Sequence, residues 1–133
     1  MSLLILVVDN EPDTEALFRQ KFRLDMKQGR CTLEFALSGA VALGKLEGGV
    51  GEPSILLLSD IDVPGMTWLT LLRQVKLLRP TLPIIMLAAD DDATTLRLAR
   101  EAGADAVFGK PIDFDALKAA IDQRFAARGI GAR

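Results

Sequence analysis

The chain has 133 residues, half of them hydrophobic, and its 16 Lys and Arg residues nearly balance its 18 Asp and Glu residues. A chain of this length buries roughly two-thirds of its unfolded surface on folding, enough for one core without disulfides or metals. The net charge of -2 argues against a protein whose main task is to grip nucleic acid or anionic lipid. We therefore expect one domain over residues 1–133, a frayed end from about residue 126, and no direct nucleic-acid or membrane partner.

Two residue counts restrict the chemistry. The chain has no histidine, which excludes histidine general bases, catalytic triads and histidine zinc sites. The single cysteine, Cys31, has no partner for an intrachain disulfide and is expected to pack as a small hydrophobic residue in a reducing compartment. The apolar start at residues 3–8 is too short to span a membrane and lacks the flanks of a signal peptide, so we expect a cytoplasmic protein.

Short apolar runs that alternate with helical segments predict the fold. Each run is bounded by Asp, Gly, Pro or Ser and suits a strand that is covered on both faces. The predicted strands are Leu3–Val8, Thr32–Phe35, Ile55–Leu58, Ile84–Leu87 and Ala106–Phe108. The predicted helices are Pro12–Lys27, a segment from the cap Ser38 through Leu46, Trp68–Leu78, Asp91–Ala102, and a segment from the cap Asp113 through Phe125. Five β-α repeats predict a doubly wound α/β domain, with helices on both faces of one parallel sheet.

Acidic residues follow the predicted strands at the edge where such sheets bind ligands. Asp9 follows the first strand, Asp60 and Asp62 follow the third, and Lys110 follows the fifth. Two neighbouring carboxylates repel each other unless a cation lies between them, and oxygen ligands favour Mg2+. Carboxylates, magnesium and a lysine in one pocket suit phosphoryl transfer, with an aspartate as the nucleophile that forms an acyl phosphate. Each aspartate taken alone would equally suit a helix cap.

Four segments resemble, in this order, the receiver domain of two-component response regulators, the CheY-like family. They are residues 4–12 (LILVVDNEP), 56–66 (LLLSDIDVPGM), 82–89 (LPIIMLAA), and 101–105 (EAGAD) followed by Lys110 and Pro111. The resemblance covers nearly the whole chain. It implies a flavodoxin-like sheet with strand order 2-1-3-4-5. It also implies a partner, either a sensor histidine kinase or a phosphotransfer protein, that donates phosphate from a phosphohistidine.

The resemblance also implies roles for single residues. Asp60 matches the residue that accepts phosphate, and Lys110 matches the lysine that pairs with the acceptor and then with the phosphoryl group. Pro111 stands where the family often has a cis peptide bond. Since the chain has no histidine, it is expected to receive phosphate rather than donate it, and not to be an enzyme with a substrate of its own. The implied Mg2+ ligands are Asp9, Asn10, Asp60 and the backbone carbonyl of Asp62.

Three positions depart from the family pattern. Asn10 stands where the family has a second acid that binds the metal directly, so Mg2+ is expected to bind more weakly. Ala88 replaces a Thr or Ser whose hydroxyl bonds the phosphoryl group, and Val107 replaces the aromatic residue that rotates with it. Such a hydrogen bond is worth about 1.5–3 kcal/mol, and moving a two-state equilibrium from 1:99 to 99:1 takes about 5.5 kcal/mol. We therefore expect an atypical switch that acts through the loops after Asp60 and Ala88.

Two alternatives stay open. A pseudo-receiver would keep the fold as a protein-binding module without phosphate; the three departures favour it, and the retained acids and lysine disfavour it. A small aspartyl-phosphate phosphohydrolase would use Asp62, two residues after Asp60, as a general acid, but no cap domain that would select a substrate is evident. Magnesium titration separates the first alternative from a phosphorylated receiver, and turnover of a phosphoester would support the second.

Two surface features bear on partners. Trp68 is expected at the edge of the core rather than as an anchor for another protein. The family binds partners on the face made by its fourth helix, fifth strand and fifth helix, and a mixed-charge solvated face explains the same residues equally well. We expect output by docking onto a downstream protein target, and a homodimer through the same face stays open. The residues expected on this face are Arg97, Arg100, Lys118 and Asp122.

Overall fold

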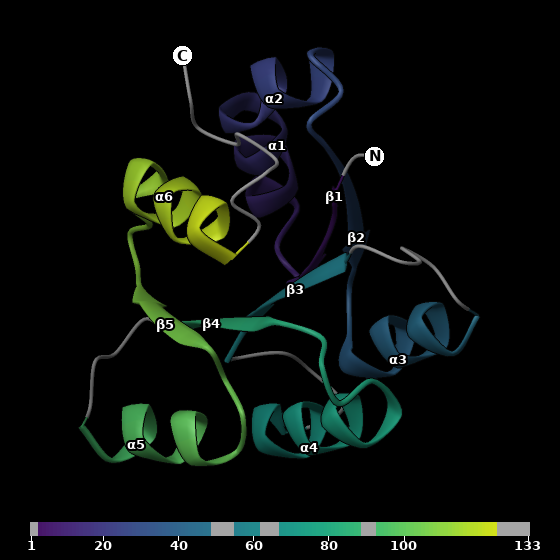
Figure 1. Cartoon of the computed structure of the whole chain (residues 1–133), viewed down its shortest axis with the longest axis vertical. Coiled ribbons are helices and arrows are strands. Elements are labelled where there is room, and N and C mark those ends of the chain that lie inside the picture. The colour runs from purple at the N-terminus through teal and green to yellow at the C-terminus, as the bar shows by residue number, and fades with distance from the viewer. Residues whose placement is uncertain (1–2, 49–54, 62–66, 89–92, 125–133) are drawn as a thin grey trace.

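A five-stranded parallel sheet lies between two layers of helices (Figure 1). The computed structural model describes residues 3–48, 55–61, 67–88 and 93–124. The strand order is β2-β1-β3-β4-β5, which confirms the predicted topology. The strands are β1 (Leu3–Val8), β2 (Cys31–Ala36), β3 (Ile55–Asp60), β4 (Ile84–Ala88) and β5 (Ala106–Gly109).

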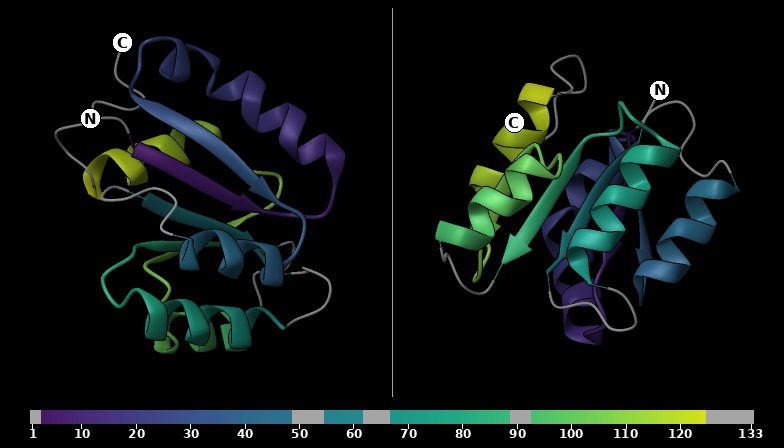
Figure 2. Two further views of the ribbon diagram at one scale, coloured as in Figure 1. Left: turned by 90° about the vertical axis from the view of Figure 1, so that its right-hand side faces the viewer. Right: turned by 90° about the horizontal axis from the view of Figure 1, so that it is seen from below.

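The helices divide between the two faces of the sheet, as the doubly wound prediction requires. Helices α1, α2 and α6 cover one face, and α3, α4 and α5 cover the other (Figure 2). Among the described residues, no helix is both long and apolar enough to cross a membrane. The helices are α1 (Pro12–Lys21), α2 (Arg23–Lys27), α3 (Gly39–Glu47), α4 (Trp68–Leu78), α5 (Ala93–Glu101) and α6 (Phe114–Arg124).

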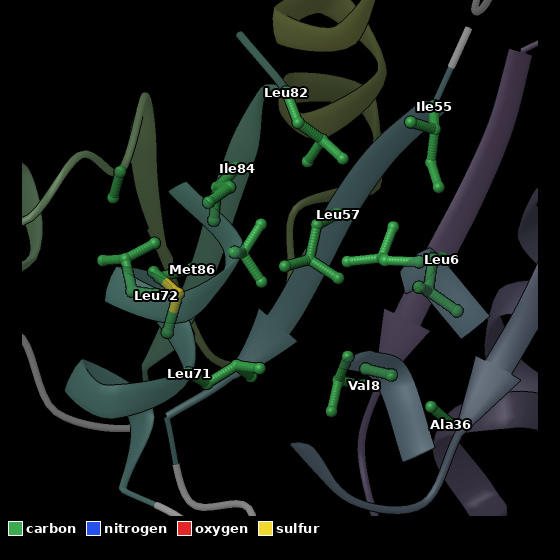
Figure 3. Packing of buried hydrophobic residues seen from close by; sticks show 14 of the residues in the cluster. Leu6, Val8, Ala36, Ile55, Leu57, Leu71, Leu72, Leu82, Ile84 and Met86 are labelled. Atoms are coloured by element: carbon green, nitrogen blue, oxygen red, sulfur yellow. The ribbon is translucent and has the colours of Figure 1, made fainter. Parts of the chain in front are cut away.

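Side-chain alternation along the strands builds one core on each face. Successive residues of a strand point to opposite sides of the sheet, so an uninterrupted apolar run places side chains in both cores. The first core includes Ile5, Val7, Phe18, Phe22, Leu56, Leu58, Phe114, Leu117 and Ile121. The second core, shown in Figure 3, includes Leu6, Val8, Leu57, Leu71, Leu72, Ile84 and Met86.

Four of the five strands are longer than their apolar runs. The prediction ends the third strand at Leu58, but β3 continues through Ser59 to Asp60, which pairs with Leu87 of β4. The polar side chains end the apolar run, but the backbone hydrogen bonds of the sheet continue, because strands lie on both sides of β3. Asp60 is therefore the last residue of the strand and not the first residue of a loop.

The predicted helix over Pro12–Lys27 is wrong at its middle. The chain leaves helical geometry at Phe22, where φ is -101° and ψ is 9°, so that α1 ends at Lys21 and α2 begins at Arg23. The carbonyl oxygen of Lys21 accepts a hydrogen bond from Lys118 Nζ at 2.6 Å. A side chain from α6 thus stabilises the break, and no local pattern in residues 12–27 reveals such a partner.

The predicted helix caps are confirmed. Ser38 Oγ accepts a hydrogen bond from the Val41 amide at 3.2 Å, and Asp113 Oδ1 accepts one from the Ala116 amide at 3.1 Å. Thr67, which the sequence analysis does not single out, caps α4 in the same way. These side chains satisfy amides that have no partner within the helix.

Candidate functional site

Three strand ends bring two carboxylates and an ammonium group together. Asp9 follows β1, Asp60 ends β3, and Lys110 follows β5. Lys110 Nζ donates a hydrogen bond to Asp60 Oδ2 and lies 4.0 Å from Asp9 Oδ2. Asp9 is 6% exposed and Asp60 3% exposed, so the two acids face a largely desolvated region at the carboxyl edge of the sheet.

Backbone hydrogen bonds fix the segments that carry these side chains. The Lys110 amide donates to the Ala88 carbonyl at 3.0 Å, which ties the segment after β5 to the end of β4. The Asp9 amide donates to the Ala36 carbonyl at 3.0 Å, and the Glu11 amide donates to Asp9 Oδ1 at 2.9 Å. One oxygen of Asp9 therefore holds the turn into α1, and the other faces Lys110.

The electrostatics of Lys110 reflect its acidic surroundings. Partial burial alone would lower the pKa of its ammonium group, because desolvation disfavours charge. The hydrogen bond and negative charge of Asp60, together with the charges of Asp9 and Glu11, outweigh burial and raise the pKa of Lys110 above its ordinary value. Lys110 therefore stays protonated at neutral pH and neutralises part of the charge of the two acids.

The donor set has room for a cation at Asp9. Asp9 Oδ2 is buried and accepts no hydrogen bond from the described residues. Asn10 is exposed beside it, where its amide oxygen is accessible. Within the described ranges, no three Cys, Asp or Glu side chains are grouped closely enough to hold a metal by themselves. A divalent ion would thus depend on Asp9 and Asp60 together with amide and backbone oxygens, while Asp62 lies outside the described residues.

Ala88 and Val107, the two positions of the predicted switch, carry neither a hydroxyl nor an aromatic ring. Ala88 is 3% exposed and pairs with Gly109 of β5. Val107 packs against the second core, whereas Phe108 packs against the first, as strand alternation predicts. Phe108 therefore cannot stand in for the aromatic residue that Val107 replaces.

A groove of about 690 Å³ opens next to Asp9 and Lys110. Its lining includes Asp9 and Lys110 from the site, Leu17 from α1, and Ile112 and Phe114 from the entry to α6. The Lys110–Pro111 peptide bond in its wall is cis.

The comparison with protein families decides what kind of domain carries this site. Residues 5–122 match the family model of the response regulator receiver domain. The chain belongs to this family. The strand order was expected from the resemblance, the acids and lysine at one sheet edge were expected from the residues that follow the apolar runs, and the family model covers nearly the full length.

Relatives of this receiver domain are found in proteins of very different length. The chain is 37% identical over 103 residues to the DNA-binding transcriptional regulator NtrC of Klebsiella pneumoniae, a match that covers 71% of this chain and 22% of that protein. It is 28% identical over 117 residues to sporulation initiation phosphotransferase F of Bacillus subtilis, covering 88% of this chain and 89% of that protein. The chain thus spans about a fifth of the length of NtrC.

Solved receiver structures agree in fold. A response regulator receiver domain from Clostridium thermocellum superposes with a TM-score of 0.81 at 23% identity, covering 95% of this chain and 96% of that one. The response regulator TrrA from Thermotoga maritima, solved in complex with Mg2+ and BeF, superposes with a TM-score of 0.73 at 26% identity, covering 91% and 97%.

One predicted surface residue of the receiver is misplaced. Lys118 was expected on an exposed partner face, but it is 5% exposed and lies against α1 and α2. Arg97 and Arg100 are exposed as expected, and Asp122 is half-buried. The prediction for Lys118 is wrong because α6 turns its apolar side toward the first core, and Lys118 belongs to that side.

One buried acid of the receiver was not predicted from the sequence. Asp25 is fully buried, and its Oδ2 lies 2.8 Å from Lys118 Nζ. A signal was present: Phe18, Phe22 and Asp25 share one helical stripe, as do Lys118 and its apolar neighbours Phe114, Leu117 and Ile121. A charge within an apolar stripe on each of two segments indicates a buried pair.

Cys31 and Trp68 lie where the sequence analysis expects them. Cys31 is buried; burial, with a smaller contribution from the charge of Asp25, raises the pKa of its thiol to about 12, although the charge of Lys118 acts in the other direction. Trp68 is half-buried and packs against the second core. It is therefore a residue of the core edge.

Proposed function

We propose that Asp60 of this receiver domain accepts a phosphoryl group from a phosphohistidine, carried by a sensor histidine kinase or a phosphotransfer protein. The observation that carries the proposal is the contact of Lys110 Nζ with Asp60 Oδ2 beside the second buried acid, Asp9. A desolvated carboxylate with a fixed cation beside it is the arrangement that phosphoryl transfer to an aspartate requires. The 30% identity over 116 residues to the sensor histidine kinase RcsC of Salmonella typhi supports a kinase partner.

The chemical step is a displacement at phosphorus. A carboxylate oxygen of Asp60 forms a new O–P bond while the N–P bond of the phosphohistidine breaks, and the imidazole leaves with the electron pair and takes up a proton. Because Lys110 covers Oδ2 and Asp60 is 3% exposed, the ammonium group has to shift from the carboxylate toward a phosphoryl oxygen as the bond forms. Lys110 keeps its proton throughout, because its pKa lies above the ordinary lysine value.

The residues present fit a divalent cation. Asp9, Asp60, the amide oxygen of Asn10 and the backbone carbonyl of Asp62 would hold Mg2+, and Asp9 Oδ2 is a buried oxygen without a hydrogen bond from the described residues. When bound, the ion neutralises charge on the phosphoryl oxygens. A neutral amide at Asn10 contributes less to the attraction than a carboxylate would, so the affinity for Mg2+ is lowered.

The output of this receiver does not use a hydroxyl relay. Ala88 offers no hydrogen bond to a phosphoryl group, and Val107 packs against the second core rather than providing an aromatic ring. The response to phosphorylation therefore depends on the phosphate and metal acting directly on the loops after Asp60 and Ala88. These loops signal by docking onto a downstream protein target.

Phosphorylation with a small acyl phosphate tests the proposal. The parent protein, Asp60→Asn and the control Asp13→Asn, which changes an exposed acid on α1, are incubated with acetyl phosphate and Mg2+. Intact-mass measurement is expected to show one added phosphoryl group on the parent and on the control, and none on Asp60→Asn. Equal mass spectra for parent and Asp60→Asn would overturn the assignment.

A pseudo-receiver that binds a partner without phosphate is the second candidate, favoured by the absence of a hydroxyl at Ala88 and of a carboxylate at Asn10. Titration of the parent with Mg2+, followed by the fluorescence of Trp68, separates the two. A saturable change in the millimolar range that Asp9→Asn weakens supports the phosphoacceptor. An unchanged signal in parent and variant supports the pseudo-receiver.

A further inference from the structure

Helices α1 and α6 meet through three aromatic rings. Phe114 at the start of α6 packs edge-on against Phe18 and Phe22, with centroid distances of 5.2 and 6.3 Å. Phe18 and Phe22 stack on each other at 5.8 Å. Edge-to-face and stacked arrangements of this kind favour one relative placement of the rings. The aromatic contact fixes how closely the two helices approach.

A buried ion pair lies deeper along the same contact. Lys118 Nζ is held by Asp25 Oδ2 at 2.8 Å and by the Lys21 carbonyl at 2.6 Å, and it lies 4.9 Å from the centroid of the Phe22 ring. The ammonium group therefore contacts an acid, a carbonyl and an aromatic face at the break between α1 and α2. We call Asp25, Lys118 and the three phenylalanines the α1–α6 clamp.

Both helices of the clamp lead directly into the candidate site. Helix α1 begins at Pro12, immediately after the segment that starts with Asp9. Helix α6 begins at Phe114, after the short link that starts with Lys110. Any sliding or rotation of α6 against α1 therefore displaces the ammonium group of Lys110 relative to the carboxylate of Asp9.

A buried ion pair is a poor means of gaining stability. Removing two charges from water is costly, and apolar residues of similar size often replace such a pair without loss of stability. The pair instead favours one relative position of the helices, because the Lys118 ammonium contacts both the Asp25 carboxylate and the Lys21 carbonyl in only one register. The aromatic rings alone tolerate small shifts that the ion pair does not.

We propose that Asp25 and Lys118 are positioning residues, which set the register of α6 on α1 and thereby hold Lys110 between Asp9 and Asp60. The effect on phosphorylation rests on the proposed function, whereas the effect on the geometry of the site does not. The pair acts through the backbone of two helices and touches no reacting atom.

The test replaces the pair by apolar residues and measures the site. The double variant Asp25→Leu/Lys118→Met removes both charges, and Arg30, which lies 3.7 Å from Asp25 Oδ1, is partly exposed, so that no unpaired charge is left buried. Its control is Glu34→Leu/Lys45→Met, which removes a partly exposed ion pair of 3.0 Å between β2 and α3. Urea denaturation is expected to give similar stabilities for the parent and the two double variants.

Hydrogen exchange reports the positioning without any phosphate. The amides of Lys110 and Glu11 are bonded within the site segments, to the Ala88 carbonyl and to Asp9 Oδ1. We expect both amides to exchange about tenfold faster in Asp25→Leu/Lys118→Met, while amides in the centre of β3 keep their rates. The rate of phosphorylation by acetyl phosphate is expected to fall by about the same factor. The control variant keeps parental rates in both measurements.

Two outcomes overturn the inference. One is a folded double variant whose Lys110 and Glu11 amides exchange as in the parent. The other is parental exchange of these amides in Lys118→Arg, which keeps the charge but places a larger group against the Lys21 carbonyl. If the double variant does not fold, the exchange measured in Lys118→Arg is the test. If the parent itself takes no phosphate, the proposed function fails, and the exchange measurement still judges the clamp.

Discussion

Lys110 Nζ donates a hydrogen bond to Asp60 Oδ2, although 50 residues separate the two in the chain. The contact exists because β5 and β3 both neighbour β4, so their carboxyl ends lie at one edge of the sheet. Asp9 from β1 joins them, with its Oδ2 4.0 Å from the same ammonium group. Two acids thus share one fixed cation, which leaves the site with an excess of negative charge that attracts a metal ion.

Removal of the lysine is expected to destabilise the protein and to increase its response to Mg2+. In Lys110→Met, Asp9 and Asp60 repel each other without compensation, and we expect a loss of about 1–3 kcal/mol in the free energy of unfolding at pH 7. Added Mg2+ stabilises because the ion binds the folded state alone. It should restore more stability in this variant than in the parent, because the two acids of the variant have no lysine to offset their charge. Urea denaturation with and without Mg2+ measures both effects, with Lys45→Met as control. Equal Mg2+ effects in parent and variant would contradict the expectation.

The same contact predicts a dependence on high pH. The pKa of Lys110 is raised in the folded state, so the stabilisation from its charge is complete below the ordinary lysine pKa of about 10.4. It is lost as the pH rises through the higher folded value. The difference in the free energy of unfolding between the parent and Lys110→Met should therefore stay constant below the ordinary lysine pKa and shrink only above it. A difference that already disappears near pH 9 would show that Lys110 loses its proton early.

Introducing a hydroxyl at Ala88, the proposed switch position, is expected to strengthen phosphate-like binding. Ala88→Thr places a donor at the end of β4, and one hydrogen bond to a charged group is worth about 1.5–3 kcal/mol, or roughly tenfold or more in affinity. Titration with Mg2+ and beryllium fluoride, followed by the fluorescence of Trp68, measures the change. Ala88→Val is the control, because it adds a side chain of the same shape without the hydroxyl. A gain shared by both variants would assign the effect to packing.

Restoring a carboxylate beside Asp9 is expected to tighten metal binding. Asn10→Asp adds a negative charge and a harder oxygen ligand at an exposed position, and we expect the dissociation constant for Mg2+ to fall by about tenfold. The free energy of unfolding without metal should fall, because the new carboxylate adds to the excess negative charge of Asp9 and Asp60. Isothermal titration measures the affinity, with Asn10→Ala as the matched loss of ligand. An affinity that is the same in all three proteins would place the metal elsewhere.

The thiol of Cys31 is expected to be unreactive in the folded protein. Burial raises its pKa to about 12, so at pH 8 it stays protonated and inaccessible. The unfolded chain loses this proton first, so this group lowers the free energy of unfolding as the pH rises from about 8.5 toward 12. A colorimetric disulfide reagent should label the protein in urea and leave it unlabelled in buffer. Fast labelling in buffer would show that β2 opens locally.

The sequence predicts most of the sheet because an apolar run depends on local burial alone. Where a strand carries polar residues, as β3 does at Ser59 and Asp60, the run ends before the backbone ladder ends. The break at Phe22 escapes prediction for another reason: it is stabilised by Lys118, which approaches from the far end of the chain. The helical pattern marks Asp25 and Lys118 as charges within apolar stripes, but it does not reveal that Lys118 bonds the Lys21 carbonyl at the break.

The candidate site follows the same division. The sequence predicts that Asp9, Asp60 and Lys110 share one sheet edge, because the carboxyl ends of parallel strands lie at the same edge. It does not predict which oxygen of Asp60 Lys110 contacts, or that one oxygen of Asp9 is used by the Glu11 amide. Those details depend on side-chain conformations that only the assembled layers determine.

The division of the helices between the two faces also orders assembly. The second core draws its helical residues from α3, α4 and α5, which follow one another in the chain. The first core joins α1 to α6, and α6 follows every other described element. We expect the middle of the chain to fold early and the contact between α1 and α6 to form late, since contacts between distant segments form more slowly. Lys110 follows β5, which pairs with β4, so the lysine meets the acids when the last strand joins the sheet, and the last helix docks onto a site that already contains its lysine.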